Sequence, residues 1–280
     1  MIRRDSEKRC PERGGSDLPP TMSTQPYLPR EICDHIIDIF HDDPETLKRC
    51  CLVSKSWVPR TQKHLFSYVT FKSADYPKWR KTFPDPMNSP ACYTQTLTVD
   101  GVLGCPEEMR QIESFSRIER LIVERPSQWA ELPDGILYLS PFYKAAPSMK
   151  SLHVDSTVLP CSQVFNLVRS LPLLEDLTLI TRGVDDGAGA KPSTPAPSPA
   201  LTGNFELVAS VGMEIILRIL LGLQGGLRFR ELRLSCCNVE DLTLVEELVL
   251  ACSDTLESLD ITCRIYRTSN PTSSLDRLVT

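Results

Sequence analysis

A short apolar segment of the form Leu-x-[Leu, Val or Ile] recurs six times in the second two-thirds of this 280-residue chain. Its first residues are Leu97, Leu121, Leu152, Leu177, Leu232 and Leu259. Subtracting successive positions gives steps of 24, 31, 25, 55 and 27 residues. Two apolar residues separated by one position lie on the same face of a β-strand, and periods of about 20 to 50 residues are typical of stacked structural units. The sequence therefore predicts a series of short strands, each belonging to one unit of an array.

Helix-like runs lie between some of these segments, at residues 162–171, 206–221 and 239–251. A unit of one strand, a connection and one helix cannot bury its apolar face alone, but stacked units can build a continuous core. We therefore expect an α+β or α/β repeat with parallel strands side by side and helices on the outer surface.

The step of 55 residues has two interpretations: two repeat lengths, or one repeat that carries an insertion. Residues 183–203, GVDDGAGAKPSTPAPSPALTG, are rich in Pro, Ala, Gly and Ser and offer little to bury. We expect a disordered insertion at 183–203.

The residue between the two apolar positions of each strand points to the opposite face. This predicts an exposed row at Thr98, Ile122, His153, Thr178, Arg233 and Asp260. Such a mixture of polar, charged and apolar side chains suits recognition of a protein surface better than enclosure of a small molecule. From this row and its flanking outward positions, the candidate residues for binding a target protein are Arg120, His153, Asp176, Glu231, Arg233 and Asp260.

The amino-terminal part has a different sequence pattern. Residues 1–26 are predicted to be a flexible tail, with Met22 as a possible alternative start. Residues 27–71 predict three short helices: the first follows Pro29, the second begins at Pro44 with Asp43 as its N-cap, and the third is capped by Ser54. Three helices of this size have little core, so we expect an apolar face to be left for a partner.

Residues 27–71 resemble an F-box. The matching residues are Leu28, Pro29, Glu31, Ile32, Ile36, Ile37, Leu47, Leu52, Val53, Ser54, Lys55, Trp57, Leu65 and Phe66. F-box modules bind the Skp adaptor of Skp/cullin/F-box ubiquitin ligases. The resemblance implies that this contact is formed or supported by Leu28, Pro29, Ile32, Ile36, Leu52, Val53 and Trp57. The alternative is a helical cap whose apolar residues face the next domain.

Residues 92–280 resemble the irregular leucine-rich repeats of F-box leucine-rich proteins. Their sequence pattern is similar to that of the expanded fungal F-box families. Only Cys237, three positions after Leu234, matches the Asn or Cys of well-formed repeats. The resemblance implies an irregular leucine-rich-repeat solenoid with parallel strands. Residues 72–91 are predicted to be a linker or a cap over the first repeat, and the polar ending at 270–280 leaves open an early end of the array or a truncated chain.

Composition excludes several classes of function. The net charge of −5, from 31 Lys and Arg against 36 Asp and Glu, supplies no basic field for nucleic acid. We find neither a secretory signal nor a membrane-spanning run. The 11 cysteines include no C-x-x-C pair, which indicates reduced thiols rather than a disulfide scaffold or a zinc ribbon. We expect a cytoplasmic or nuclear protein.

No phosphate-binding loop, nucleophile elbow, calcium loop or metal-binding histidine pair occurs. We therefore expect no catalytic residues, no metal and no cofactor, and a protein that is not an enzyme. The preferred hypothesis is a substrate-recognition subunit that docks the Skp adaptor, and through it a cullin, while the repeats bind an unknown target protein. The alternatives are a non-catalytic scaffold that acts without cullin, a repeat protein without a Skp partner, and an enzyme hidden in the repeats.

Overall fold

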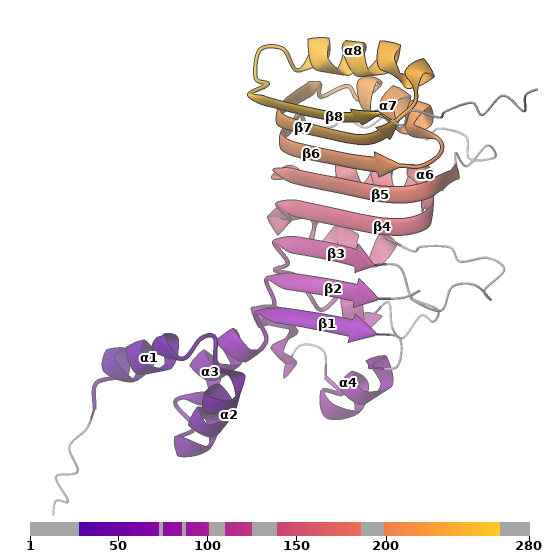
Figure 1. Ribbon diagram of the computed structural model, residues 1–280. Helices are drawn as coiled ribbons and strands as arrows, with labels where there is room; N and C mark the ends of the chain where they lie inside the picture. Colours follow the sequence, from indigo (N-terminus) through magenta and orange to yellow (C-terminus); the bar gives the residue numbers. More distant parts are fainter. Residues whose placement is uncertain are drawn as a thin grey trace, which may run out of the picture.

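The computed structural model describes residues 28–72, 75–85, 88–100, 110–124, 139–185 and 199–263. They form an α/β fold in which three helices precede one all-parallel sheet of eight strands (Figure 1). The predicted tail at 1–26, most of the predicted insertion and the polar ending at 270–280 lie outside the described residues.

The strands lie in the sheet in the order of the chain. Their bounds are β1 Tyr68–Lys72, β2 Thr96–Asp100, β3 Arg120–Glu124, β4 Ser151–Pro160, β5 Asp176–Asp185, β6 Leu201–Ala209, β7 Leu227–Cys237 and β8 Ser258–Cys263. The α-helices are α1 Arg30–Ile39, α2 Pro44–Val53, α3 Val58–Leu65, α4 Tyr76–Thr82, α6 Cys161–Arg169, α7 Met213–Leu221 and α8 Leu242–Ala251. Short 3₁₀ helices are η2 Pro90–Tyr93, η4 Ser140–Lys144, η5 Ala146–Ser148 and η6 Val239–Asp241.

A ladder of apolar side chains holds the strands in register. The first residues of the six recurring segments, with Phe205 of β6, pair across the sheet in an unbroken series from Leu97 to Leu259. From Leu97 to Leu232 these side chains are buried. A shift of one residue would move a whole strand's apolar set to the other face, so this ladder fixes the register. All six predicted strands are confirmed.

In the part of the chain that the structure describes, helices α6 and α7 cover one face of the sheet. Helices α6 and α7 lie behind the central strands in Figure 1, and each buries one side, for example through Phe165 and Leu217. Strands that follow one another in chain order, joined by crossovers of one hand, bring every connection back on the same side. The described helices leave the opposite face uncovered, and β3 and β4 alternate buried residues with half-buried or exposed ones.

Backbone carbonyls organise the edge where the strands begin. The carbonyl of Glu119 accepts hydrogen bonds from the backbone N–H groups of Lys150 and Ser151, at 2.7 and 3.0 Å. The same arrangement joins the preceding and following strands. At β6 the carbonyl of Glu175 accepts from Asn204 at 2.6 Å, and Gly203 passes beside it with a left-handed backbone, φ +80°.

The step of 55 residues corresponds to two strand-to-strand intervals. Strand β6 lies between β5 and β7, and Phe205 pairs with both Leu177 and Leu232. The helix predicted at 206–221 is wrong in its first part, because Glu206–Ala209 continue β6 and α7 begins at Met213. The predicted insertion is also too long, since 183–185 end β5 and 201–203 begin β6.

The sheet begins earlier than predicted. Tyr68–Phe71, assigned above to the three-helix segment 27–71, form most of β1. In the segment predicted as a linker or cap, Tyr76 stacks on Phe71 with ring centroids 4.9 Å apart, and Trp79 meets Phe71 edge to face at 5.1 Å. These aromatic rings extend the core past the first strand.

At the other end of the sheet the predicted burial is wrong for one leucine. Leu259 is 45% exposed, although its partner Leu232 is buried. Strand β8 has no further strand beside it among the described residues, so the end of the ladder is open to solvent there.

The three amino-terminal helices form where the sequence places them, with one shift. The Asp43 side chain caps α2 by accepting from the backbone N–H groups of Glu45 and Thr46. Ser54 does not cap α3; its hydroxyl contacts Ser56 instead, and α3 begins at Val58. The helices have a small core of their own, formed by Ile37, Leu47 and Cys50, outside the core cluster of the sheet.

We predict that Gly203→Ala destabilises the protein much more than Gly226→Ala. Both glycines have positive φ, but a Cβ at Gly203 would overlap the Glu175 carbonyl, whereas Gly226 has nothing within 4 Å. We expect about 1–2 kcal/mol for Gly226→Ala from backbone strain alone, and about 3 kcal/mol or more for Gly203→Ala because overpacking adds to the strain. Urea unfolding of both variants measures the difference; equal losses would contradict the close approach.

Candidate protein-interaction surfaces

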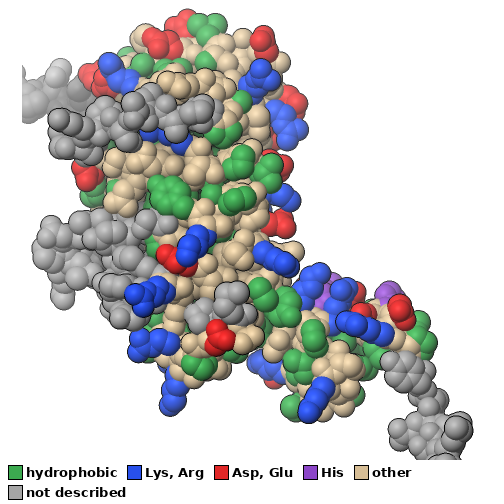
Figure 2. Space-filling view, turned by 180° about the vertical axis from the view of Figure 1, so that it is seen from behind, with side chains coloured by type: hydrophobic (Ala, Val, Ile, Leu, Met, Phe, Trp, Pro, Cys, Tyr) green, Lys and Arg blue, Asp and Glu red, His purple; other side chains and the backbone are tan. Residues whose placement is uncertain are grey.

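Apolar side chains are exposed on the helical module, residues 28–65. The exposed fraction of the side chain is 48% for Ile32, 87% for Leu52 and 65% for Val53. Leu28, Ile39 and Phe40 are exposed too, and apolar side chains are visible on the module at the lower right of Figure 2. We name these six residues the helical apolar surface. A concentration of apolar residues on a small module marks a site of interaction.

Most of the residues predicted for the adaptor contact are at the surface. Leu28, Pro29, Ile32, Leu52 and Val53 are exposed, whereas Ile36 and Trp57 are half-buried. The buried apolar residue of α1 is Ile37, whereas Ile32 and Ile39 of the same helix are exposed. Five of the seven expected contact residues are thus accessible to a partner. Ile36 and Trp57 are accessible only in part.

One carboxylate ties α1 to α3. Arg60 donates to both oxygens of Asp38, through Nε at 2.6 Å and through Nη2, and His64 Nε2 lies 2.7 Å from Asp38 Oδ1. The Arg60 guanidinium, more than His64, holds the pKa of Asp38 well below its ordinary value of 3.8. A bidentate arginine fixes geometry as well as charge, so this network stabilises the angle between the two helices.

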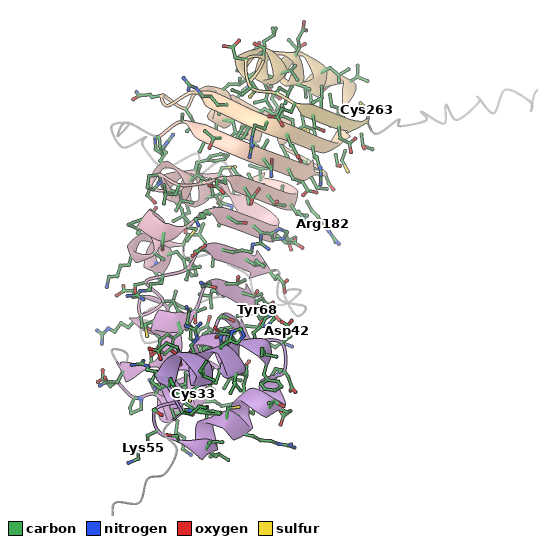
Figure 3. All side chains as sticks on the ribbon, turned by 90° about the vertical axis from the view of Figure 1, so that its left-hand side faces the viewer. Cys33, Asp42, Lys55, Tyr68, Arg182 and Cys263 are labelled. Carbon is green, nitrogen blue, oxygen red and sulfur yellow. The ribbon has the colours of Figure 1, made fainter. Side chains whose placement is uncertain are left out.

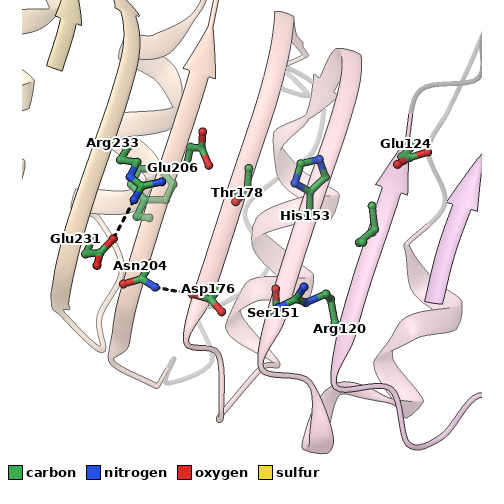
Figure 4. A pocket seen from close by; sticks show the side chains of 12 residues that line it. Arg120, Glu124, Ser151, His153, Asp176, Thr178, Asn204, Glu206, Glu231 and Arg233 are labelled. Carbon is green, nitrogen blue, oxygen red and sulfur yellow. Dashed lines mark hydrogen bonds and ion pairs between the residues drawn. The ribbon is translucent and has the colours of Figure 1, made fainter. Parts of the chain in front are cut away.

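The open face of the sheet contains a hollow of about 460 Å³ (Figure 4). Its lining comes from strands β3 to β7, and the side chains project from neighbouring strands toward solvent. The lining residues are Arg120, Ile122, Glu124, Ser151, His153, Asp176, Thr178, Asn204, Phe205, Glu206, Glu231 and Arg233. We call this site the sheet hollow. Its lining is mostly polar and charged, unlike the apolar pockets that enclose small molecules.

The structure brings five of the six predicted target-binding residues together in the sheet hollow. These are Arg120, His153, Asp176, Glu231 and Arg233. Asp260 lies one strand further, paired in register with Arg233 on β8, and is exposed. Their grouping follows from the register, because equivalent outward positions of parallel neighbours form rows across the sheet.

Sequence reasoning missed Asn204 and Glu206, since β6 was not identified as a strand. The available signal was Phe205-Glu206-Leu207, which has the same alternation as the other segments but begins with Phe. Thr98 was predicted to be exposed and is 2% exposed. Its hydroxyl shares a hydrogen bond with the hydroxyl of Tyr68 at 3.2 Å, so the Tyr68 side chain from β1 covers it.

Two contacts hold side chains inside the sheet hollow. Asn204 Nδ2 donates to Asp176 Oδ1 at 2.7 Å, and Arg233 Nη2 donates to Glu231 Oε2 at 3.4 Å. The first contact fixes Asp176, while the second pairs two exposed charges only loosely. The hollow can thus offer charges and hydrogen bonds to a partner.

The nine cysteines in the described part of the chain are free thiols. No disulfide joins any of the described cysteines. Burial raises the pKa of the Cys237 thiol to about 11 and also raises the pKa of the Cys252 thiol. A thiol that stays protonated at neutral pH is a poor nucleophile.

Among the residues that the structure describes, no group of three or more His, Cys, Asp or Glu side chains is arranged to hold a metal ion. In the same part of the chain, we find no helix with the length and apolar character needed to cross a membrane.

A comparison of the chain with protein-family models, curated proteins and solved structures finds no match in any of the three.

We predict that Asp38→Asn loosens the helical module by about 1 kcal/mol, because it removes a charged, partly exposed network. The folded-state pKa of Asp38 is lowered, so its stabilising contribution is complete above pH 3.8 and decreases as the pH falls below that value. Hydrogen exchange of amides in α1 and α3, compared with wild type at the same pH, measures the effect.

The expected difference between variant and wild type is complete above pH 3.8 and shrinks as the pH falls below that value. Asp34→Asn serves as the control, because Asp34 makes a long contact of 3.9 Å with the exposed Arg30 and has the smallest of the electrostatic influences on Arg60, without a hydrogen bond to it. A pH-independent difference for Asp38→Asn would contradict the charge-based explanation.

Proposed function

We propose that this protein is a substrate-recognition subunit of a Skp/cullin/F-box ubiquitin ligase. In this proposal α1–α3 form the F-box that docks the Skp adaptor, and strands β1–β8 with their helices form an irregular leucine-rich-repeat domain that binds the target. The observation that carries the proposal is the helical apolar surface, where Ile32, Leu52 and Val53 are exposed on a module with its own small core.

The physical argument for docking is the cost of leaving this surface in water. Burying apolar area contributes roughly 25 cal/mol per Å², and the fixed geometry of α1 and α3 reduces the ordering required on binding. The Asp38 network provides that geometry. Leu52 and Val53, at the end of α2, would add exposed apolar area to the contact with a complementary apolar groove.

The proposed mechanism is proximity rather than chemistry on this chain. A receptor that holds a target and an adaptor at once raises the effective concentration of a target lysine near a ubiquitin-loaded enzyme. The helical module lies at the β1 end of the sheet and is separated along the molecule from β8, as the positions of Cys33 and Cys263 show in Figure 3. Adaptor and target would thus bind without competing.

We predict that the double variant Ile32→Ala, Leu52→Ala reduces capture of purified Skp adaptor at least tenfold. The two truncations remove exposed apolar area from the proposed contact without touching the buried Ile37 or Leu47. Pull-down with the adaptor measures this, and circular dichroism checks the fold.

Leu173→Ala is the matched control, since Leu173 is 50% exposed but lies outside the helical module. Capture unchanged by the double variant would remove the docking assignment.

We expect the wild-type chain, mixed with Skp adaptor and cullin, to elute as a ternary complex in size-exclusion chromatography. A complex with the adaptor that excludes cullin would support the scaffold alternative instead. Absence of any adaptor complex would refute both hypotheses.

A further inference from the structure

Three cysteines gather where strands β7 and β8 end. Cys236 and Cys237 are the last residues of β7, and Cys263 is the last residue of β8 (Figure 3). Cys237 pairs in register with Cys263 across the two parallel strands. Cys237 is fully buried, whereas Cys263 is exposed. One thiol of this pair is therefore open to a reagent in solution, and its neighbour is shielded from it.

Both thiols of the pair lie on the leucine-bearing face of the sheet. Cys263 follows Leu259 and Ile261 at every second position, and strand residues at this period share one face. Cys237 is buried, as is Leu234, which lies opposite Ile261. Burial most of all, and then the electrostatic influence of Cys263, raises the pKa of the Cys237 thiol. Register, face and electrostatic influence thus agree that the two thiols are neighbours.

An extra residue in β7 produces this alignment. Ser235 pairs with Thr262 and Cys237 with Cys263, so two steps along β7 match one step along β8. The extra residue is Cys236, which has a left-handed backbone, φ +71°, a conformation strained for any residue with a side chain. Without this bulge, simple alternation would turn Cys237 to the opposite face. The strained residue therefore keeps Cys237 on the same face as Cys263.

The spacing of neighbouring strands suits a disulfide bond. Adjacent strands lie about 4.8 Å apart, and the Cα atoms of a disulfide are about 4.4 to 6.8 Å apart. Two cysteines in register on one face meet this requirement, and their Cβ atoms point the same way. Cys237 and Cys263 are free thiols here, so the structure shows the reduced state of the pair.

We propose that Cys237 and Cys263 form a disulfide bond when oxidised glutathione reaches Cys263. The Cys263 thiolate attacks one sulfur of oxidised glutathione, whose S–S bond breaks, and a Cys263–glutathione disulfide forms as one glutathione leaves. The Cys237 thiolate then attacks the Cys263 sulfur and releases the second glutathione. Two electrons pass from the two protein thiols to one molecule of oxidised glutathione, and the two protons end on the two glutathione thiols.

The bond would fasten the open end of the sheet. Among the described residues β8 has a neighbouring strand on one side only, and Leu259 is 45% exposed, so β8 opens more easily than a central strand. The disulfide closes a loop, residues 237–263, that contains α8, and a closed loop limits such opening. It also holds Asp260 beside Arg233. This inference is independent of the proposed function, because neither adaptor nor target takes part in it.

Mass spectrometry of the full chain tests the proposal. The protein is incubated with oxidised glutathione, its remaining thiols are alkylated with N-ethylmaleimide, and it is digested with trypsin and Glu-C. Cleavage after Arg and Glu separates residues 234–240, which contain Cys236 and Cys237, from residues 258–264, which contain Cys263. We expect these two peptides joined by a disulfide. A glutathione adduct on 258–264 should precede the link, because the raised pKa of Cys237 slows the second step.

Single serine variants assign the bond. Cys263→Ser changes an exposed side chain and should abolish the link. Cys237→Ser should abolish the link but keep the glutathione adduct on Cys263. Cys236→Ser is the matched control, because Cys236 is adjacent to Cys237 but out of register, and it should keep the link. Oxidation should slow amide hydrogen exchange in β8 about tenfold or more in wild type and leave it unchanged in Cys263→Ser.

Absence of the linked peptide in wild type, a link that persists in Cys237→Ser, or a link lost in Cys236→Ser would each overturn the proposal. Exchange in β8 that does not respond to oxidation would overturn the fastening of the sheet end. Adaptor capture is measured on the reduced protein. A failure of the proposed function is therefore recorded separately from a failure of the disulfide.

Discussion

The burial of one leucine-bearing face of a parallel sheet is the interaction on which the rest of this structure depends. Leu121, Leu152 and Leu177 lie in register on adjacent strands and are fully or almost fully buried. The strands follow chain order, and among the described residues helices α6 and α7 pack behind the central strands on one side. The core is therefore continuous along the sheet, and each strand is stabilised by its neighbours.

The open face is the direct consequence of this arrangement. Parallel sheets are usually covered on both faces. Here the described helices cover one face, so outward side chains such as His153 and Thr178 can be polar. The register places these side chains in rows across five strands, so arginines and carboxylates of neighbouring strands lie side by side along the lining of the sheet hollow.

The helical module is stabilised in a different way from the sheet. Its buried residues are few, and the angle between α1 and α3 depends on Asp38 with Arg60 and His64 rather than on a large core. The apolar residues that would enlarge a core in a bigger domain, such as Leu52, lie outside instead. This distribution is consistent with a surface kept for a partner, and it supports the proposed docking function.

The sequence by itself determined six of the eight described strands, because alternation of Leu and Val with polar residues indicates a half-buried strand, as at Leu152-His153-Val154. It also determined five of the six expected residues of the sheet hollow and the cap of α2 at Asp43. The tertiary structure alone decided the rest. Strand β6 begins its motif with Phe205 instead of Leu, and its pairing with β5 and β7 establishes it as a strand. Thr98 is covered by Tyr68 from a neighbouring strand, and Leu259 is exposed because the described sheet ends at β8. Local pattern fixes which way a side chain points, but burial depends on what lies beside it in space.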